Sequence, residues 1–257
     1  MNDKVKIGLA LGAGATRGMA HIGVLQVMEE LGVRPDFIAG SSIGSLVGAL
    51  YAAGVSPKMM EGIAQNLDAK LCYDIGIPRK GFIRGKKLED LIRLMTRNKS
   101  FEDLDIPLAI TAVDLIKGER VIIKEGNVAQ AVRASISIPG VFQPVYKGDK
   151  VLVDGGILER IPVGTVGEMG ADFIIGVDVG SRGDHRPSTN IIEIIIQSFD
   201  VMQKEIAENN TIKDAVMVIP EINLENPLGF DQVGETIEAG RIAAMDVLGK
   251  LKEITTG

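Results

Sequence analysis

The chain has 257 residues, of which 46% are hydrophobic and 24% are charged. This composition excludes a disordered protein and allows one sizeable buried core, so we expect a single domain over residues 1–257. The formal net charge of −6 argues against general affinity for nucleic acid. The single cysteine, Cys72, excludes an internal disulfide, and no apolar run approaches the roughly 20 residues that span a bilayer. We therefore expect a cytoplasmic protein.

The chain opens with two strand–turn–helix units. Val5–Leu11 is typical of a buried strand, and it leads into a glycine-rich turn and an amphipathic helix over Met19–Leu31. Asp36–Ala39 predicts a second short strand, followed by a helix of small residues over Ser45–Ala53. Two such units in succession predict an α/β fold with a parallel sheet.

Caps and apolar runs predict the remaining elements. Ser56 before Pro57 is typical of a helix N-cap followed by proline at the first helical position. The helix predicted at Ile191–Asn209 is apolar nearly all round, which indicates core burial or an oligomer interface. The other expected elements are helices at Lys87–Arg97, Val128–Ala134 and Gln232–Leu251, and strands at Leu108–Val113, Arg120–Lys124, Lys150–Val153, Phe173–Val179 and Val216–Ile219.

The turn after the second strand holds a candidate nucleophile. Gly40-Ser41-Ser42-Ile43-Gly44 fits the pattern G-x-S-x-G, in which Gly40 and Gly44 permit a sharp turn that lifts Ser42 clear of the sheet. The helix that follows points its positive end at this hydroxyl, which favours a developing alkoxide. The alternative is an ordinary glycine-flanked helix cap, because serine is a common N-cap.

The turn after the first strand, Gly12–Gly18, has two interpretations. A dinucleotide-binding loop needs G-x-G-x-x-G, but Arg17 stands where the third glycine belongs and Gly18 comes one residue late. The second strand also lacks the acidic residue that holds a ribose. The other interpretation is an oxyanion hole, in which backbone N–H groups stabilise a charged carbonyl oxygen by about 3 kcal/mol. A nucleotide-binding module and a catalytically idle scaffold remain as non-catalytic alternatives.

Ser42 needs a base, and the chain offers three candidates. We expect His21, one turn past the glycine loop, to be a packed or surface residue. His185 follows both the serine and an aspartate, as a Ser42–His185–Asp triad on an α/β-hydrolase sheet requires. Asp154 ends a predicted strand and is followed by two glycines, so it can reach a site at the same edge of the sheet. It would be a useful base only if burial raised its pKa above the ordinary value of about 3.9, and a plain Asp-Gly turn is the alternative.

Together these motifs resemble the patatin-like phospholipase family, in particular its small bacterial members. The resemblance implies a three-layer α/β/α sandwich around a mostly parallel sheet. It also implies cleavage of lipid acyl esters without a metal or an organic cofactor. The matching segments are Gly12–Gly18 with His21–Leu25, Gly40–Tyr51, Ala134–Pro139 with Phe142 and Pro144, and Val153–Gly156, and weaker similarity continues to the final helix.

The same resemblance implies roles for individual residues. Ser42 attacks the ester carbonyl and Asp154 takes its proton, as a dyad without a catalytic histidine. N–H groups around Gly14 and Ala15 hold the oxyanion, and Arg17 braces the loop. The implied oxyanion and substrate-binding loop comprises Gly12, Gly14, Ala15, Arg17 and Gly18.

Three positions depart from the family pattern. Ala13 and Ala15 stand where many members carry glycine. Glu159-Arg160 stands where many have asparagine, which bears on the local support of Asp154. Gly156 is often alanine elsewhere, a difference that we expect to change little.

Residues 79–99 carry eight basic residues against two acidic ones, a local charge of +6 in an acidic chain. The helix predicted within them has one apolar face, formed by Leu88, Leu91, Ile92 and Met95. We hypothesise that this segment contacts anionic lipid headgroups. The alternative is a helix packed on the core with a solvated basic face.

Overall fold

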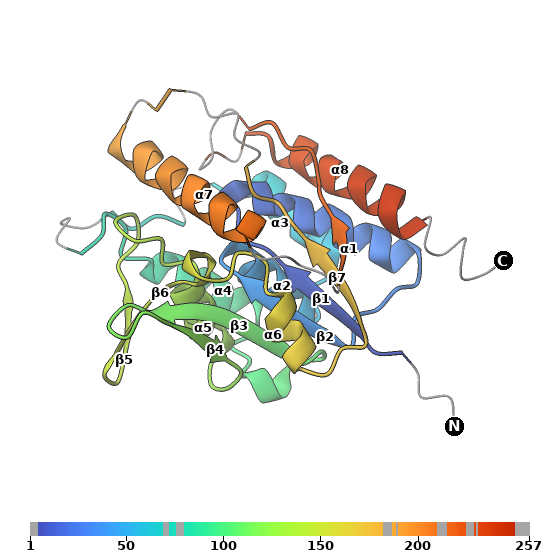
Figure 1. Cartoon of the computed structure of the whole chain (residues 1–257), viewed down its shortest axis with the longest axis horizontal. Coiled ribbons are helices and arrows are strands. Elements are labelled where there is room, and N and C mark those ends of the chain that lie inside the picture. Colours follow the sequence, from blue (N-terminus) through green and yellow to red (C-terminus); the bar gives the residue numbers. More distant parts are fainter. Residues whose placement is uncertain are drawn as a thin grey trace.

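The computed structural model describes residues 5–68, 72–75, 80–181, 187–188, 190–209, 215–224, 229 and 231–249. Within these residues, helices flank a central sheet of eight strands, which confirms the α/β class (Figure 1). No helix in this part of the chain is long and apolar enough to cross a bilayer. That residues 1–257 form one domain stays a prediction.

The sheet is mixed, with a parallel centre and an antiparallel margin. Its strands are β1 (Ile7–Leu11), β2 (Phe37–Ser41), β3 (Leu108–Asp114), β4 (Glu119–Ile123), β5 (Val145–Lys147), β6 (Lys150–Asp154), β7 (Phe173–Val177) and β8 (Ala215–Val218). The hydrogen-bonded order is β5-β6-β3-β2-β1-β7-β8, and β4 also pairs with β3. From β3 to β8 the neighbours in this order are parallel, whereas β4 and β6 are antiparallel to β3. The mostly parallel centre is as expected.

The described helices are α1 (Ala20–Glu30), α2 (Ile43–Ala52), α3 (Pro57–Asn66), α4 (Lys86–Met95), α5 (Val128–Ser135), α6 (Val163–Glu168), α7 (Ile191–Asn209) and α8 (Val233–Ala244). The predicted N-cap is confirmed, because Ser56 Oγ accepts the N–H of Met59 at 3.3 Å. The predicted helices and strands are all present, α7 with the predicted bounds and the others with one or both ends shifted, whereas β5 and α6 are additional. The last helix gives way to a π-helical turn at residues 245–249, and its predicted end at Leu251 lies outside the described residues.

The two faces of the sheet differ in the size of their side chains. Large residues such as Leu9, Leu11 and Ile110 point to one face, where they pack with α1, α2, α3, α4, α5 and α8. Small residues such as Ala10 and Ala39 point to the other face, where they pack with α6. Figure 1 shows α6 on the near side of the sheet, with α2, α4 and α5 behind it. The three expected layers are therefore present and are unequal in thickness.

One edge of β3 brings two other strands together end to end. The pairing of β2 with β3 ends where Ser41 lies opposite Thr111. The pairing of β6 with β3 begins at the next residue of β3, where Asp154 lies opposite Ala112. β4 pairs along the same part of β3 and therefore occupies its other edge. β2 and β6 thus share one edge and approach each other from opposite directions. This arrangement places Ser42, which follows β2, beside the last residue of β6.

Candidate active site

The turn between β2 and α2 is strained and tightly packed. Ser42 is the N-cap of α2 with φ 52° and ψ −124°, a conformation that residues with a side chain rarely adopt. A Cβ atom at Gly44 would lie 2.1 Å from the carbonyl oxygen of Leu11, and one at Gly40 would lie 2.5 Å from Ser45 Cα. Both positions therefore require glycine, Gly44 because α2 begins directly against the end of β1 and Gly40 because the turn folds back on the start of α2. This is the strand–turn–helix geometry that the G-x-S-x-G pattern predicted.

The side chains of Ser42 and Asp154 meet in the interior. Ser42 Oγ donates a hydrogen bond to Asp154 Oδ2 over 2.6 Å. Asp154 is fully buried, and its Oδ1 accepts the N–H of Gly156 at 2.8 Å. Burial raises the pKa of Asp154 to about 7, although the hydrogen bonds from Ser42 and Gly156 oppose the shift. A carboxylate with a pKa near neutrality is a much better proton acceptor than an ordinary one.

The carboxyl end of α5 supports both partners. The N–H of Ser42 donates to Ser135 Oγ at 2.9 Å, and the N–H of Asp154 donates to the carbonyl oxygen of Ser137 at 3.0 Å. Arg133 is also buried and donates from Nη1 to Ser137 Oγ at 2.6 Å. In the sequence, Ser135 and Ser137 stand out only as part of a family motif. Arg133 carries no signal there except its i, i+4 spacing to Ser137.

The glycine-rich loop between β1 and α1 offers backbone donors near Ser42. The N–H groups of Gly12 and Ala13 donate to carbonyl oxygens of neighbouring segments. Within the described residues, the N–H groups of Gly14 and Ala15 have no acceptor. Ala15 has a positive φ of 50° and lines the same pocket as Ser42. Gly14 and Ala15 thus keep N–H groups without an acceptor in this part of the chain, whereas Gly12 anchors the loop to the sheet.

Arg17 and Gly18 hold the loop against its neighbours. Arg17 Nε donates to the carbonyl oxygen of Val179 at 3.1 Å, and its Nη2 lies 2.5 Å from Asp200 Oδ2 on α7. Both charged side chains are buried. A Cβ atom at Gly18 would lie 2.3 Å from the side chain of Ile43, so glycine allows the loop to approach the start of α2. These contacts agree with a bracing role for Arg17.

The histidine that the structure describes lies apart from the hydrogen-bonded pair. His21 is fully buried, and its Nε2–H donates to the carbonyl oxygen of Gly12 at 2.8 Å. Burial lowers the pKa of His21 to about 4, so the ring is neutral at pH 7 and braces the loop. His185, the candidate member of a triad, lies outside the described residues. Ser42 and Asp154 contact each other directly, with no ring between them.

The departures from the family pattern have structural consequences beyond the loop. Glu159 accepts a hydrogen bond from Arg120 Nη1 at 2.8 Å, so it is tied to β4 and not to Asp154. The carbonyl oxygen of Arg160 accepts an N–H of the glycine-rich loop. A Cβ atom at Gly156 would lie 2.1 Å from Gln203 Nε2. A methyl group at position 156 would therefore require the end of the Gln203 side chain to move, and the expectation that alanine there changes little stays a prediction.

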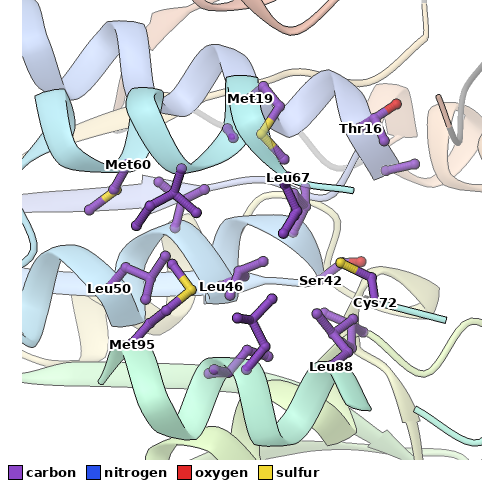
Figure 2. Close-up of a pocket in the computed structure, with 18 of the residues that line it drawn as sticks. Thr16, Met19, Ser42, Leu46, Leu50, Met60, Leu67, Cys72, Leu88 and Met95 are labelled. Carbon is purple, nitrogen blue, oxygen red and sulfur yellow. The ribbon is translucent and has the colours of Figure 1, made fainter. Parts of the chain in front are cut away.

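A pocket of about 140 Å³ opens onto Ser42 (Figure 2). Its described lining contains no charged side chain and comes mainly from α2, α3 and α4. Burial raises the pKa of the Cys72 thiol, and it raises the pKa of Tyr73 to about 12, so these two lining residues are also neutral at pH 7. Figure 2 shows Ser42 near Cys72 at one end, while Leu50 and Met60 lie toward the other. The pocket suits an uncharged, apolar group attached to the atom that Ser42 attacks.

The basic segment has its apolar face turned inward. Leu88, Leu91, Ile92 and Met95 of α4 all line the pocket, and Lys86 and Arg93 form ion pairs with Asp90 and Glu89 within the same helix. The alternative interpretation of this segment, a helix packed on the core, is thus confirmed. Leu94 is the exception, with 76% of its surface exposed beside these charges. Arg79, the first basic residue of the segment, lies outside the described residues.

Comparison with protein families relates this site to a known group. The sequence profile of the family described as patatin-like phospholipase matches residues 9–166, which is more than half of the chain. An NTE family protein of Mycobacterium tuberculosis is 37% identical over 177 residues, covering 68% of this chain and 49% of the relative. The lysophospholipase nte1 of Aspergillus fumigatus is 33% identical over 187 residues, covering 70% of this chain and 12% of the relative. The chain therefore spans about half or less of the length of these relatives.

Solved structures show the same fold at low identity. VipD from Legionella pneumophila superposes with a TM-score of 0.68 at 13% identity, covering 96% of this chain and 67% of that one. The type III effector ExoU superposes with a TM-score of 0.54 at 16% identity, covering 96% of this chain and 54% of that one. At these identities the likeness concerns the fold alone.

Proposed function

The chain belongs to the patatin-like phospholipase family, and from that premise we propose that it is a serine hydrolase that cleaves acyl esters of lipids. One observation carries the proposal. Ser42 Oγ lies 2.6 Å from the buried Asp154 carboxylate and lines an uncharged apolar pocket. The hydrogen bond supplies a nucleophile with its base, and the pocket supplies a place for a fatty acyl chain.

The reaction follows from these contacts in two steps. Asp154 Oδ2 takes the proton of Ser42 as Oγ attacks the ester carbonyl, and the resulting oxyanion accepts hydrogen bonds from the free N–H groups of Gly14 and Ala15. Asp154 returns the proton to the departing alcohol, which leaves an acyl-enzyme. Asp154 then takes a proton from the water that attacks the acyl-enzyme, and it returns this proton to Ser42 Oγ as the fatty acid leaves.

The dimensions of the pocket suit one fatty acyl chain. The lining residues of α2 extend from the cap Ser42 to Leu50, which is about 12 Å along the axis at about 1.5 Å per residue. The volume of about 140 Å³ is close to that of a cavity that binds benzene, so the pocket takes the part of an acyl chain nearest the ester. Leu50 and Met60, at the far end, are 5% and 2% exposed. The name of the fungal relative, a lysophospholipase, is consistent with a substrate that carries a single acyl chain.

The decisive test is active-site labelling with a fluorophosphonate probe. The wild type should be labelled, whereas Ser42→Ala should not be labelled at all and Asp154→Asn only slowly. His185→Ala should be labelled and should hydrolyse esters at the wild-type rate, because the dyad needs no histidine. Loss of both activities in His185→Ala would instead support the Ser42–His185–Asp triad. A screen of lysophospholipids, phospholipids and short esters, with and without an alcohol acceptor, would then separate hydrolase from acyltransferase activity.

We also propose that α4 contacts the surface of lipid aggregates. Leu94 is exposed near the end of α4, Arg84, Lys86 and Lys87 are exposed at its start, and other residues of the same helix line the pocket. Leu94→Ser and Arg84→Glu should each weaken co-sedimentation with phosphatidylglycerol vesicles, with little effect on hydrolysis of a soluble ester. Unchanged vesicle binding in both variants would overturn this contact. A cytoplasmic location stays a prediction.

A further inference from the structure

The helix α7 places two buried polar side chains against the site. Asp200 pairs with Arg17 of the glycine-rich loop, as described above. Gln203, one turn further along α7, is 3% exposed, and its Nε2 has no hydrogen-bond partner within the described residues. A buried amide donor without an acceptor is unfavourable and therefore unusual in a folded protein.

The position of this amide relates it to Asp154. A Cβ atom built on Gly156 would lie 2.1 Å from Gln203 Nε2 and 3.0 Å from Asp154 Oδ1. Because both atoms lie so close to one point, no more than 5.1 Å separates them. The absence of a side chain at Gly156 thus provides the space in which the amide lies. To come within a hydrogen-bonding distance of about 3 Å of Oδ1, Nε2 would have to move by no more than about 2 Å.

Asp154 Oδ1 can accept one more hydrogen bond than it does. It receives the N–H of Gly156, and a carboxylate oxygen can accept a second hydrogen bond. In the part of the chain that the structure describes, no arginine or lysine pairs with Asp154, whereas Arg17 Nη2 pairs with Asp200 and Arg160 Nη2 pairs with Asp178. Among the described residues, Gln203 Nε2 is therefore a neutral buried donor without an acceptor. It lies near Asp154 Oδ1, a buried acceptor that can take one more hydrogen bond.

We propose that Gln203 is a positioning residue that donates from Nε2 to Oδ1 of the charged Asp154 and keeps Oδ2 turned toward Ser42. This inference rests on the proposed function of Ser42 and Asp154. A neutral donor stabilises the carboxylate without the permanent charge of a lysine or arginine, so the group remains basic enough to take the serine proton. Gly156 is part of the same arrangement, because any larger residue there displaces the amide.

Gln203→Met tests the donor while keeping the shape of the side chain. At pH 7 we expect kcat to fall about tenfold, the effect of one hydrogen bond to a charged group, with KM nearly unchanged. The acid limb of the pH profile should move up by about one unit, and the loss should shrink at pH 9, where Asp154 is charged in both proteins. Met202→Leu, an exposed neighbour on α7, is the matched control and should behave as wild type.

Gly156→Ala provides a second test that does not remove the amide. Alone it should reproduce the shifted pH profile, because the new methyl group displaces Gln203. In a Gln203→Ala background the same substitution should add little further loss, since the space is already empty. Thermal melting of each variant checks that the fold is intact.

The rate of fluorophosphonate labelling against pH distinguishes failure of this inference from failure of the proposed function. If the wild type is not labelled at Ser42, the proposed function falls and the role of Gln203 falls with it. If the wild type is labelled but Gln203→Met keeps the wild-type pH profile, or loses the same factor at every pH, this inference alone is overturned.

Discussion

The helices around the site form two groups with different chemistry. α3 and α4 contribute apolar side chains to the pocket, such as Met60 and Met95. α7 contributes Asp200 and Gln203, which are buried and polar. In the proposed reaction Ser42 and Asp154 need directed hydrogen bonds, and loss of one leaves a buried polar atom unpaired. The acyl chain needs only an apolar volume of suitable shape, which tolerates substitutions that conserve volume. Substitutions should therefore be more costly on the polar side than on the apolar side.

The largest effect is expected at the reacting pair itself. Ser42→Ala and Asp154→Asn should each lower kcat by roughly 10⁴-fold or more, by analogy with the removal of single members of other serine hydrolase sites. The double variant should lose little more than either single one, because the two side chains act as a unit. Steady-state hydrolysis of a p-nitrophenyl ester measures both. Residual activity within tenfold of wild type in either variant would exclude that residue from catalysis.

Arg17→Met should give the next largest effect, on stability. The substitution leaves the buried Asp200 without its partner, which we expect to cost about 3–5 kcal/mol in the free energy of unfolding. Arg241→Met, which breaks the more exposed pair with Glu30, is the control and should cost less than about 1 kcal/mol. Urea denaturation compares them. Adding Asp200→Asn to Arg17→Met should recover much of the lost free energy of unfolding. Equal costs for Arg17→Met and Arg241→Met would contradict the expectation that substitutions cost more at the buried polar contacts of α7.

The pH dependence should reflect Asp154, whose pKa burial raises to about 7. The base must be charged, so kcat/KM should fall about tenfold for each pH unit below 7. The free energy of unfolding should change in the opposite direction and rise as the pH falls. The pKa of Asp154 in the folded protein lies above the unfolded value of about 3.9. The contribution of this group to the free energy of unfolding is therefore full below pH 4, where the carboxyl is protonated, and is lost as the pH rises through 7.

Melting curves test this second part, because Asp154→Asn carries no charge to bury. The variant should melt at a higher temperature than wild type at pH 8 and should show a smaller difference at pH 5. A rate profile that is flat from pH 5 to pH 9 would rule out Asp154 as the base.

The smallest effect is expected at the far end of the apolar pocket. Leu50→Phe shortens the space available to the acyl chain, so long-chain esters should lose about fourfold in kcat/KM for each methylene excluded, at about 0.8 kcal/mol per CH₂. Butyrate esters, which do not reach Leu50, should be cleaved as before. Leu94→Phe, on the exposed face of α4, is the control. A uniform loss across all chain lengths would indicate a packing defect instead of a shorter pocket.

The sequence alone predicted the local features of this protein. Glycine spacing predicted the turn at Gly40–Gly44, because the close approach of backbone to backbone at both glycines excludes a side chain. Periodicity predicted α4 and its apolar face, and Ser56 predicted the start of α3. β5 and α6 were not predicted, because elements of three and six residues are too short to show a periodic pattern.

Only the tertiary structure determined which residues far apart in the sequence lie in contact. Asp154 was one of three candidate bases in the sequence, and the shared edge of β3 brings it into contact with Ser42, 112 positions away. Burial of its carboxyl, the inward turn of the α4 face and the approach of Gln203 all arise from contacts between distant segments. Such contacts depend on register, and on the close packing of elements whose local patterns do not specify their partners. A chemical group can be recognised from its neighbours in the chain, but its pKa and its partner are set by neighbours in space.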